Sequence, residues 1–252
     1  MNILLINSSS RINGNTSKVL DEYKKDFLQH NCIVTSINLF TKNIKNCLGC
    51  RNCFDKGEMN CPLKDDLLEI VNFINTNDIV IFGTPIYVED VNGILKNFID
   101  RMAYNSHRPQ FFNNKAYVIT TSGIGSSNHG VQTVMRALKS WAFNVIGHKK
   151  YIAGANINKE TFFSKNRIII EQEVNKILQN NNKKNIISLL YFKVQQNFYL
   201  NRSEKDTYDY LYWVNNGLLD NNRNYYYSMK VNPFKLLIVS ILVWIIRKII
   251  LK

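Results

Sequence analysis

The stretch NILLINSSSRINGNTS, residues 2–17, joins a short apolar run to a row of small polar side chains. Residues 3–6 have the length and composition of a buried strand, and apolar residues recur at helical spacing from Val19 to Phe27. The segment therefore predicts a strand, a loop and a helix. Backbone amides at a helix N-terminus bind anions, and short hydroxyl and amide side chains donate without crowding. We expect this loop to surround a phosphate, with Gly14 permitting its tight turn.

The loop lacks two common nucleotide signatures. It has neither the Gly-Lys-Ser/Thr ending of a Walker loop nor the G-x-G-x-x-G dinucleotide fingerprint. A mononucleotide such as FMN fits better than ATP or NAD. The alternative is a polar turn with a Ser or Thr cap and no ligand.

Outward from this unit, strand and helix patterns alternate as far as about Gly154. β-Branched runs predict further strands at 33–38, 79–82, 116–120 and 144–152. Helical spacing predicts helices around residues 67–74, with Asp65 as N-cap, and around 94–99, 131–141 and 168–178. Five parallel strands with right-handed crossovers form an α/β doubly wound sheet with helices on both faces. Its ligand should lie beyond the carboxyl ends of the strands.

The turn after the third expected strand reads Gly83-Thr84-Pro85-Ile86-Tyr87, and the fourth strand ends in TTSGIG at 120–125. Pro85 removes an amide and fixes φ, so it stiffens a loop whose other amides can face a ring ligand. Tyr87 offers an aromatic face for stacking. The alternative is an ordinary strand-to-helix turn.

These motifs resemble those of NADPH-dependent FMN reductases and iron-sulfur flavoproteins. Residues 8–16 align with the family loop G-S-P-R-x-N-G-N-T and match it at Ser9, Arg11, Asn13, Gly14, Asn15 and Thr16, with Ser8 and Ser10 in place of its Gly and Pro. Residues 83–87 and 91–101 match G-[ST]-P-[VI]-Y and v-x-G-x-[LM]-K-x-[FL]-[IV]-D-R, whereas Val88 departs from a frequent aromatic. The resemblance covers about residues 1–150 and implies a flavodoxin-like fold. It implies FMN binding by these residues: Ser9, Arg11, Asn13, Asn15, Thr16, Ser17, Thr84, Pro85, Ile86, Tyr87, Thr121, Ser122 and Gly123.

Four of the five cysteines are clustered as Cys47-x2-Cys50-x2-Cys53-x7-Cys61, and only Cys32 stands apart. Three cysteines at two-residue gaps suit an iron-sulfur cluster, whereas structural zinc usually has two separated pairs. The resemblance to iron-sulfur flavoproteins, which have an Asp-Asp pair after the motif, implies a [4Fe-4S] cluster. Free or redox-active thiols and zinc remain alternatives.

Residues 181–252 form an extension of different composition, after an FMN-binding domain at 1–180. It contains aromatic clusters and, at 236–246, an apolar run flanked by Lys235 and Arg247. A bilayer span needs about 20 apolar residues, so spanning would bury Arg247 and Lys248. We expect a helical extension whose last helix lies in the plane of a membrane surface. A dimer-packing helix and a short span are the alternatives.

The net charge of +13 suggests anionic partners, but no zinc-finger, helix-turn-helix or RNP pattern accompanies it, and we expect no nucleic-acid partner. The N-terminus lacks a signal-peptide pattern, which predicts a cytoplasmic protein, at the inner face of the membrane if the last helix binds there. The lone histidines His107 and His129 are expected to be polar surface residues.

Hydride and electron transfer are chemistry of the flavin itself, so we assign no catalytic side chain. The expected function is an oxidoreductase, a homo-oligomer, that passes electrons from NAD(P)H through FMN to a flavin, quinone, nitro compound or protein acceptor. The alternatives are an iron-sulfur electron carrier between protein partners and a membrane-tethered flavin sensor.

Overall fold

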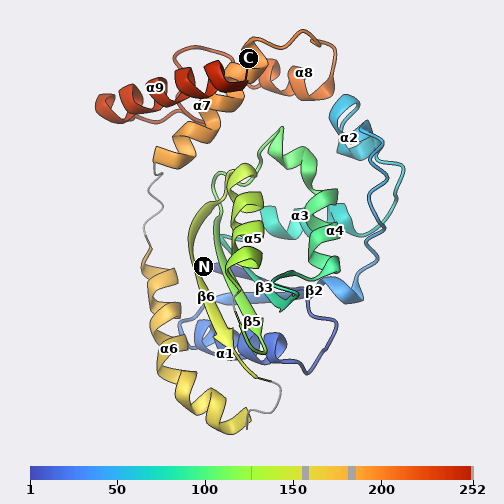
Figure 1. Cartoon of the computed structure of the whole chain (residues 1–252), viewed down its shortest axis with the longest axis vertical. Coiled ribbons are helices and arrows are strands. Elements are labelled where there is room, and N and C mark those ends of the chain that lie inside the picture. The colour runs from blue at the N-terminus through green and yellow to red at the C-terminus, as the bar shows by residue number, and fades with distance from the viewer. Residues whose placement is uncertain (126, 155–158, 181–185, 251–252) are drawn as a thin grey trace.

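The computed structural model describes residues 1–125, 127–154, 159–180 and 186–250. Strands alternate with helices up to α6, and only helices follow (Figure 1). The elements are β1 (Asn2–Asn7), α1 (Asn15–Gln29), β2 (Ile33–Asn38), η1 (Leu39–Thr41), α2 (Asn52–Asp55), η2 (Glu58–Asn60), α3 (Leu67–Asn75), β3 (Ile79–Tyr87), β4 (Asp90–Val91), α4 (Gly93–Arg101), η3 (Ala103–Ser106), β5 (Lys115–Ser122), α5 (Asn128–Ser140), β6 (Asn144–Ile152), α6 (Lys159–Gln179), α7 (Ile186–Leu200), α8 (Tyr208–Asn215) and α9 (Pro233–Ile250).

The predicted parallel sheet is confirmed, with strand order β2-β1-β3-β5-β6. The sheet has a sixth strand that the sequence analysis missed, because β4 pairs antiparallel with the end of β3. Val88 and Glu89 both have positive φ, 50° and 64°, which lets two residues reverse the chain between β3 and β4. A two-residue strand has too little sequence to show a period. The strand order changes direction between β1 and β3, which are adjacent in the sheet.

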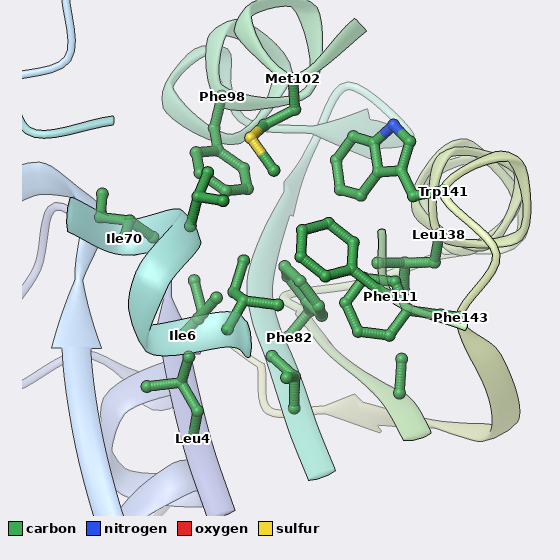
Figure 2. Packing of buried hydrophobic residues seen from close by; sticks show 14 of the residues in the cluster. Leu4, Ile6, Ile70, Phe82, Phe98, Met102, Phe111, Leu138, Trp141 and Phe143 are labelled. Carbon is green, nitrogen blue, oxygen red and sulfur yellow. The ribbon is translucent and has the colours of Figure 1, made fainter. Parts of the chain in front are cut away.

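Two hydrophobic clusters cover the two faces of the sheet. Helices α3, α4 and α5 pack on one face, where Phe82 from β3 lies among aromatic residues including Phe111, Trp141 and Phe143 (Figure 2). Helices α1 and α6 pack on the other face around Tyr23 of α1. The near-continuous burial of β1, β3 and β5 follows from this coverage, and it explains why these strands read as apolar runs.

The start of α3 differs from the prediction. Its N-cap residue is Asp66, and Asp65 lies one residue earlier. Asp65 Oδ1 accepts a hydrogen bond from the Leu67 amide at 3.2 Å, so Asp65 still satisfies one amide of the first turn. Its main partner is Arg101, whose guanidinium reaches both carboxylate oxygens.

The extension forms a third hydrophobic cluster built from α7, α8, α9 and the aromatic segment between α8 and α9. It packs on Phe112 and Ala142, which precede the amino ends of β5 and β6. The extension therefore lies at the end of the molecule opposite the carboxyl ends of the strands (Figure 1). The domain boundary expected at 180/181 adjoins residues 181–185, which lie outside the described residues. Over the described ranges, no helix has both the length and the apolar character to cross a bilayer.

Candidate functional site

Three loops meet where the carboxyl ends of β1, β3 and β5 lie side by side. In the sheet, Asn7 of β1 pairs with Gly83 of β3, and Pro85 of β3 pairs with Thr121 of β5. The loop between β1 and α1, residues 8–14, named the phosphate loop after its expected ligand, therefore shares one edge of the sheet with the end of β3 at Thr84–Tyr87 and the segment after β5. The turn expected at residues 83–87 is instead a continuation of β3, which pairs with β4 and β5 there. This edge includes the reversal of strand order, which is where doubly wound sheets bind ligands.

The first turn of α1 is open to an anion. Gly14 occupies the N-cap position, and among the described residues no side chain caps this end of the helix. The amides of Asn15, Thr16 and Ser17 are therefore the unpaired donors of a helix N-terminus. A Cβ on Gly14 would lie 2.9 Å from the Arg11 Cβ, so a larger residue would force the loop to move. An uncapped N-terminus behind a tightly folded polar loop fits a phosphate group.

Hydrogen bonds from neighbouring segments fix the shape of this loop. The Ser8 amide donates to the Gly83 carbonyl at 2.9 Å, and the Ser9 amide donates to Asn7 Oδ1 at 2.9 Å. Two residues that the sequence analysis missed hold the loop from outside it. Asn92 Nδ2 donates to the Ser8 carbonyl at 2.5 Å, and Asn38 Nδ2 donates to the Ser9 carbonyl at 3.1 Å. Asn92 also caps α4, so the Asn-Gly pair at the start of that helix was the signal available in the sequence.

The predicted binding residues divide into a buried floor and an exposed rim. On the floor, the hydroxyls of Thr16 and Thr121 are 2.7 Å apart, which joins the start of α1 to the end of β5. The rest of the buried set is Ser9, Ser17, Thr84, Pro85 and Ser122. The rim consists of the exposed Arg11, Asn13, Tyr87 and Gly123, with Asn15 and Ile86 half-buried between rim and floor. The structure thus brings the three loops together, while the side chains of Arg11 and Asn13 face solvent.

The turn between β3 and β4 projects from the same edge. Val88 is 99% exposed at φ 50°, a conformation that is costly for a β-branched side chain. The Glu89 carbonyl accepts a hydrogen bond from the Gly130 amide of α5 at 3.1 Å. A Cβ on Gly130 would lie 2.5 Å from Ile86 Cδ1, so α5 approaches this turn closely. The turn is therefore held in a strained form by α5.

All four clustered cysteines line one cavity of about 350 Å³. Cys47 and Cys50 are exposed, and Cys53 and Cys61 are half-buried. Among the described residues, however, no three Cys, His, Asp or Glu side chains are grouped as metal ligands. The expected set of four ligands is thus gathered around one cavity but not arranged for ligation. The donor chemistry, four thiols on one cavity, fits an iron-sulfur cluster better than a hard cation.

Two buried arginines lie at or behind the wall of the cysteine cavity: Arg101 lines it, and Arg108 pairs with Glu58 of its lining. Arg101 is 5% exposed, forms a bidentate pair with Asp65, and places Nη2 3.8 Å from Cys61 Sγ. Arg108 is 1% exposed and is ion-paired with Glu58, another residue of the cavity wall, at 2.5 Å. Burial raises the pKa of the Cys53 thiol to about 11, although the positive charge of Arg108 opposes this. Arg101 therefore places a guanidinium beside the Cys61 thiol, while the charges of Arg101 and Arg108 are balanced by Asp65 and Glu58.

Arg108 also joins the cavity to the extension. Its guanidinium pairs with the fully buried Asp209 of α8, and it lies 4.8 Å from the centre of the Tyr208 ring. His107 Nδ1 lies 2.6 Å from Asp209 Oδ2, and Phe54 of α2 stacks on the His107 ring at 4.4 Å. His107 is thus partly exposed, as expected of a polar surface residue, but it is also paired with a buried carboxylate, whereas His129 is exposed as expected. No local pattern indicates this pair, because His107 and Asp209 are 102 residues apart along the chain.

The family model of NADPH-dependent FMN reductases matches residues 1–156. The chain belongs to this family. An iron-sulfur flavoprotein of Archaeoglobus fulgidus is 32% identical over 141 residues, which are 56% of this chain and 63% of that protein. An iron-sulfur flavoprotein of Clostridioides difficile is 40% identical over 104 residues, which are 40% of this chain and 45% of that protein. The matches thus span less than two thirds of these relatives.

Membership of the FMN reductase family agrees with the observed fold. The structure of an NAD(P)H:quinone oxidoreductase from Methanothermobacter marburgensis superposes with a TM-score of 0.52 and 13% identity, covering 72% of this chain and 98% of that chain. At this identity the similarity shows the fold alone. It confirms the flavodoxin-like architecture that the three loop motifs implied.

Proposed function

We propose that this protein is an NAD(P)H-dependent FMN oxidoreductase. The observation that carries the proposal is the meeting of three family loops at the carboxyl ends of β1, β3 and β5, beside the uncapped start of α1. The family match over residues 1–156 supports the same activity. FMN, when bound, supplies hydride acceptance and the onward transfer of electrons.

The loop at residues 9–17 would hold the FMN phosphate. The amides of Asn15 to Ser17 offer donors at the positive end of α1. The Ser9 hydroxyl forms hydrogen bonds with the backbone amide and carbonyl of Arg11, in the same loop as these donors. The exposed Arg11 adds a mobile positive charge at the rim. Binding here needs no movement of the sheet, because the contacts of Asn38 and Asn92 already fix the loop.

The other two loops would orient the flavin ring. The Thr84–Tyr87 segment supplies a stiff backbone with an exposed aromatic ring, and Thr121 to Gly123 lie across from it. Thr16 and Thr121 hold the two sides of the site at a fixed separation through their hydroxyl contact. The chain thus positions the ligand and shields one side of it with the sheet. The reaction itself needs no acid or base from the side chains that we describe.

Anaerobic spectroscopy tests this function. Purified protein reconstituted with FMN should bleach when NADH or NADPH is added, because the flavin accepts the hydride. The variant Thr121→Val should weaken FMN binding, since it removes one of the two hydroxyls that meet at the floor. The matched variant Thr76→Val, at an exposed hydroxyl at the C-terminal end of α3, should bind FMN normally. Failure of the wild-type protein to bind FMN would refute the proposal.

We further propose that Cys47, Cys50, Cys53 and Cys61 ligate a [4Fe-4S] cluster. The support comes from their common cavity, from the Arg101 guanidinium that lies 3.8 Å from Cys61 Sγ, and from the iron-sulfur flavoproteins among the relatives. Anaerobically isolated protein should contain iron and acid-labile sulfide, both of which should fall in Cys50→Ser. The variant Cys32→Ala, at the buried cysteine outside the cavity, is the control. Absence of iron and sulfide from the wild-type protein would disprove the cluster, and zinc in their place would identify the alternative.

An electron carrier between protein partners is the second candidate function. The cysteine cavity favours it, because a cluster relays single electrons and two of its ligands, Cys47 and Cys50, are exposed to a partner. Prompt bleaching of FMN by a nicotinamide supports the enzyme, whereas bleaching only by a reduced protein donor supports the carrier.

The remaining proposals concern partners and place of work. We propose a small-molecule or protein electron acceptor, a homo-oligomer, and activity in the cytoplasm without a nucleic-acid partner. We also propose that residues 1–180 and 181–252 act as an FMN-binding domain and a helical extension. Light scattering of the purified protein measures the oligomeric state, and a monomer at all concentrations would contradict that proposal.

A further inference from the structure

Helix α9 has one packed face and one exposed apolar face. Val239 is 1% exposed and lies in the hydrophobic cluster of the extension, with Val243 packed against the same cluster. The opposite face is open at Phe234, Leu237, Ile241, Trp244 and Ile245, which are between 41% and 69% exposed. These positions follow one another at helical spacing, so they form a continuous stripe. Apolar stripes of this kind mark interaction surfaces.

The charge around this stripe has a single sign. Residues 221–252 contain six basic residues and no acidic residue. Within α9, Lys235 lies at one end of the stripe and Arg247 and Lys248 lie at the other, all of them exposed. The Lys248 ammonium lies 4.0 Å from the centre of the Trp244 ring, so the charge and the apolar surface are in contact. A complementary partner for this surface is therefore apolar opposite the middle of the helix and negatively charged opposite its two ends.

We propose that the exposed face of α9 docks in the plane of an anionic phospholipid surface. Acyl chains would cover Leu237, Ile241 and Trp244, and phosphate headgroups would meet Lys235 and Arg247. Tryptophan favours this boundary, because its ring is apolar and its indole N–H is polar.

A second copy of the chain is a poorer occupant because of the charge pattern. An antiparallel pair of α9 helices centred on Ile241 would place Lys235 of one copy at the same level along the helix axes as Arg247 of the other. A parallel pair would bring identical lysines together. With no acidic residue from position 221 onward, neither arrangement neutralises these charges. An anionic surface satisfies both ends of the helix at once.

Docking through α9 would fix the orientation of the rest of the molecule relative to the lipid surface. The extension packs near the amino ends of β5 and β6, and the three candidate flavin loops lie at the opposite edge (Figure 1). The flavin loops would therefore stay open to soluble coenzyme. The cysteine cavity lies closer to the extension than the flavin loops do, because α2, which contains Cys53, packs against α8.

Trp244 makes the proposal directly measurable. The chain has three tryptophans, of which Trp141 and Trp213 are 1% and 0% exposed and Trp244 is 57% exposed. Vesicles made of equal parts phosphatidylcholine and phosphatidylglycerol should shift the emission to the blue and co-sediment the full chain. Phosphatidylcholine vesicles alone should do neither. Salt at about 1 M, where the Debye length falls to about 3 Å, should release the protein.

Two sets of variants separate the apolar and basic contributions. The triple variant Leu237→Ser, Ile241→Ser, Trp244→Ser should lose co-sedimentation. A control with serine at Ile187, Phe198 and Leu211, which are similarly exposed on α7 and α8, should retain it.

Replacing the two basic residues should weaken binding to anionic vesicles without disturbing the fold. Lys235→Gln with Arg247→Gln should weaken partition about 25-fold, or about fivefold per charge removed. Lys165→Gln with Lys205→Gln, at exposed lysines outside α9, should leave partition nearly unchanged. Near-ultraviolet circular dichroism shows whether each variant is folded, and the charge variants test the proposal even if the serine variant unfolds.

Three results would overturn this inference. The first is no binding of the wild-type protein to the anionic vesicles. The second is binding that survives both the triple serine and the double glutamine variants. The third is a wild-type protein that does not bind vesicles but self-associates, together with a triple serine variant that does not self-associate. That result would assign the face to a second copy.

Discussion

Replacement of Asp209 by Asn should loosen the contact between the extension and the cysteine cavity. The Asp209 carboxylate is fully buried and meets both Arg108 and His107. After the substitution, the buried guanidinium of Arg108 would retain only Glu58 as an anionic partner. Because removal of one member of a buried pair leaves a charge uncompensated, such changes cost about 3 to 5 kcal/mol. Glu58 and the remaining amide oxygen compensate in part, so we expect the lower end, about 3 kcal/mol.

Two measurements on metal-free protein check this prediction. Urea unfolding gives the loss in stability, and labelling of Cys53 in the native state reports whether the wall of the cavity has opened. Labelling should accelerate, because Phe54 and Glu58, which contact His107 and Arg108, follow Cys53 on the same short segment. Asp206→Asn, at an exposed carboxylate three residues earlier, is the matched control and should change neither quantity. A stability loss below about 1 kcal/mol with unchanged labelling would show that the network does not hold the extension to the cavity.

Three further predictions follow from single positions. Gly14→Ala should weaken FMN binding about tenfold, the equivalent of one misplaced hydrogen bond, whereas Gly93→Ala, whose Cβ would meet no described atom within 4 Å, should not; fluorescence titration measures both. Val88→Asn should raise stability by about 1 kcal/mol in urea unfolding, because Asn tolerates positive φ better than a β-branched residue; an unchanged midpoint would contradict the strain. Burial raises the pKa of Glu173, but hydrogen bonds from Lys176 and Tyr117 outweigh it and lower the pKa below its ordinary value. Glu173→Gln should therefore cost about 1 kcal/mol at neutral pH, and the difference should vanish as the pH falls through the lowered folded-state pKa, where the wild-type carboxyl is protonated; a difference that persists there would contradict the pKa shift.

The elements of the sheet were predictable because their residues repeat on a local period. The apolar runs of β1, β3 and β5 are buried on both faces, and the helices between them have apolar stripes. The strand β4 was not predictable from its two residues. Its existence depends on the positive φ of Val88 and Glu89 and on the contact of Glu89 with α5.

The binding loops were predictable as motifs, but their supports were not. Residues of the phosphate loop share a short segment, so composition and spacing indicate an anion site there. Asn38 and Asn92 hold that loop from 29 and 84 positions away. No local pattern connects such residues, because their contact arises only when the sheet brings β1 beside β2 and β3.

The sequence by itself determined the doubly wound architecture, the polar loop expected to hold a phosphate and the cysteine spacing, because each depends on residues that are close along the chain. Tertiary structure alone decided that Arg101 lines the cysteine cavity and that Arg108 pairs with Glu58 of its wall. It also decided that the extension reaches that cavity through Asp209. A buried ion pair has no sequence period, since its partners are chosen by packing. For the same reason, only the packed structure shows which face of α9 is left open.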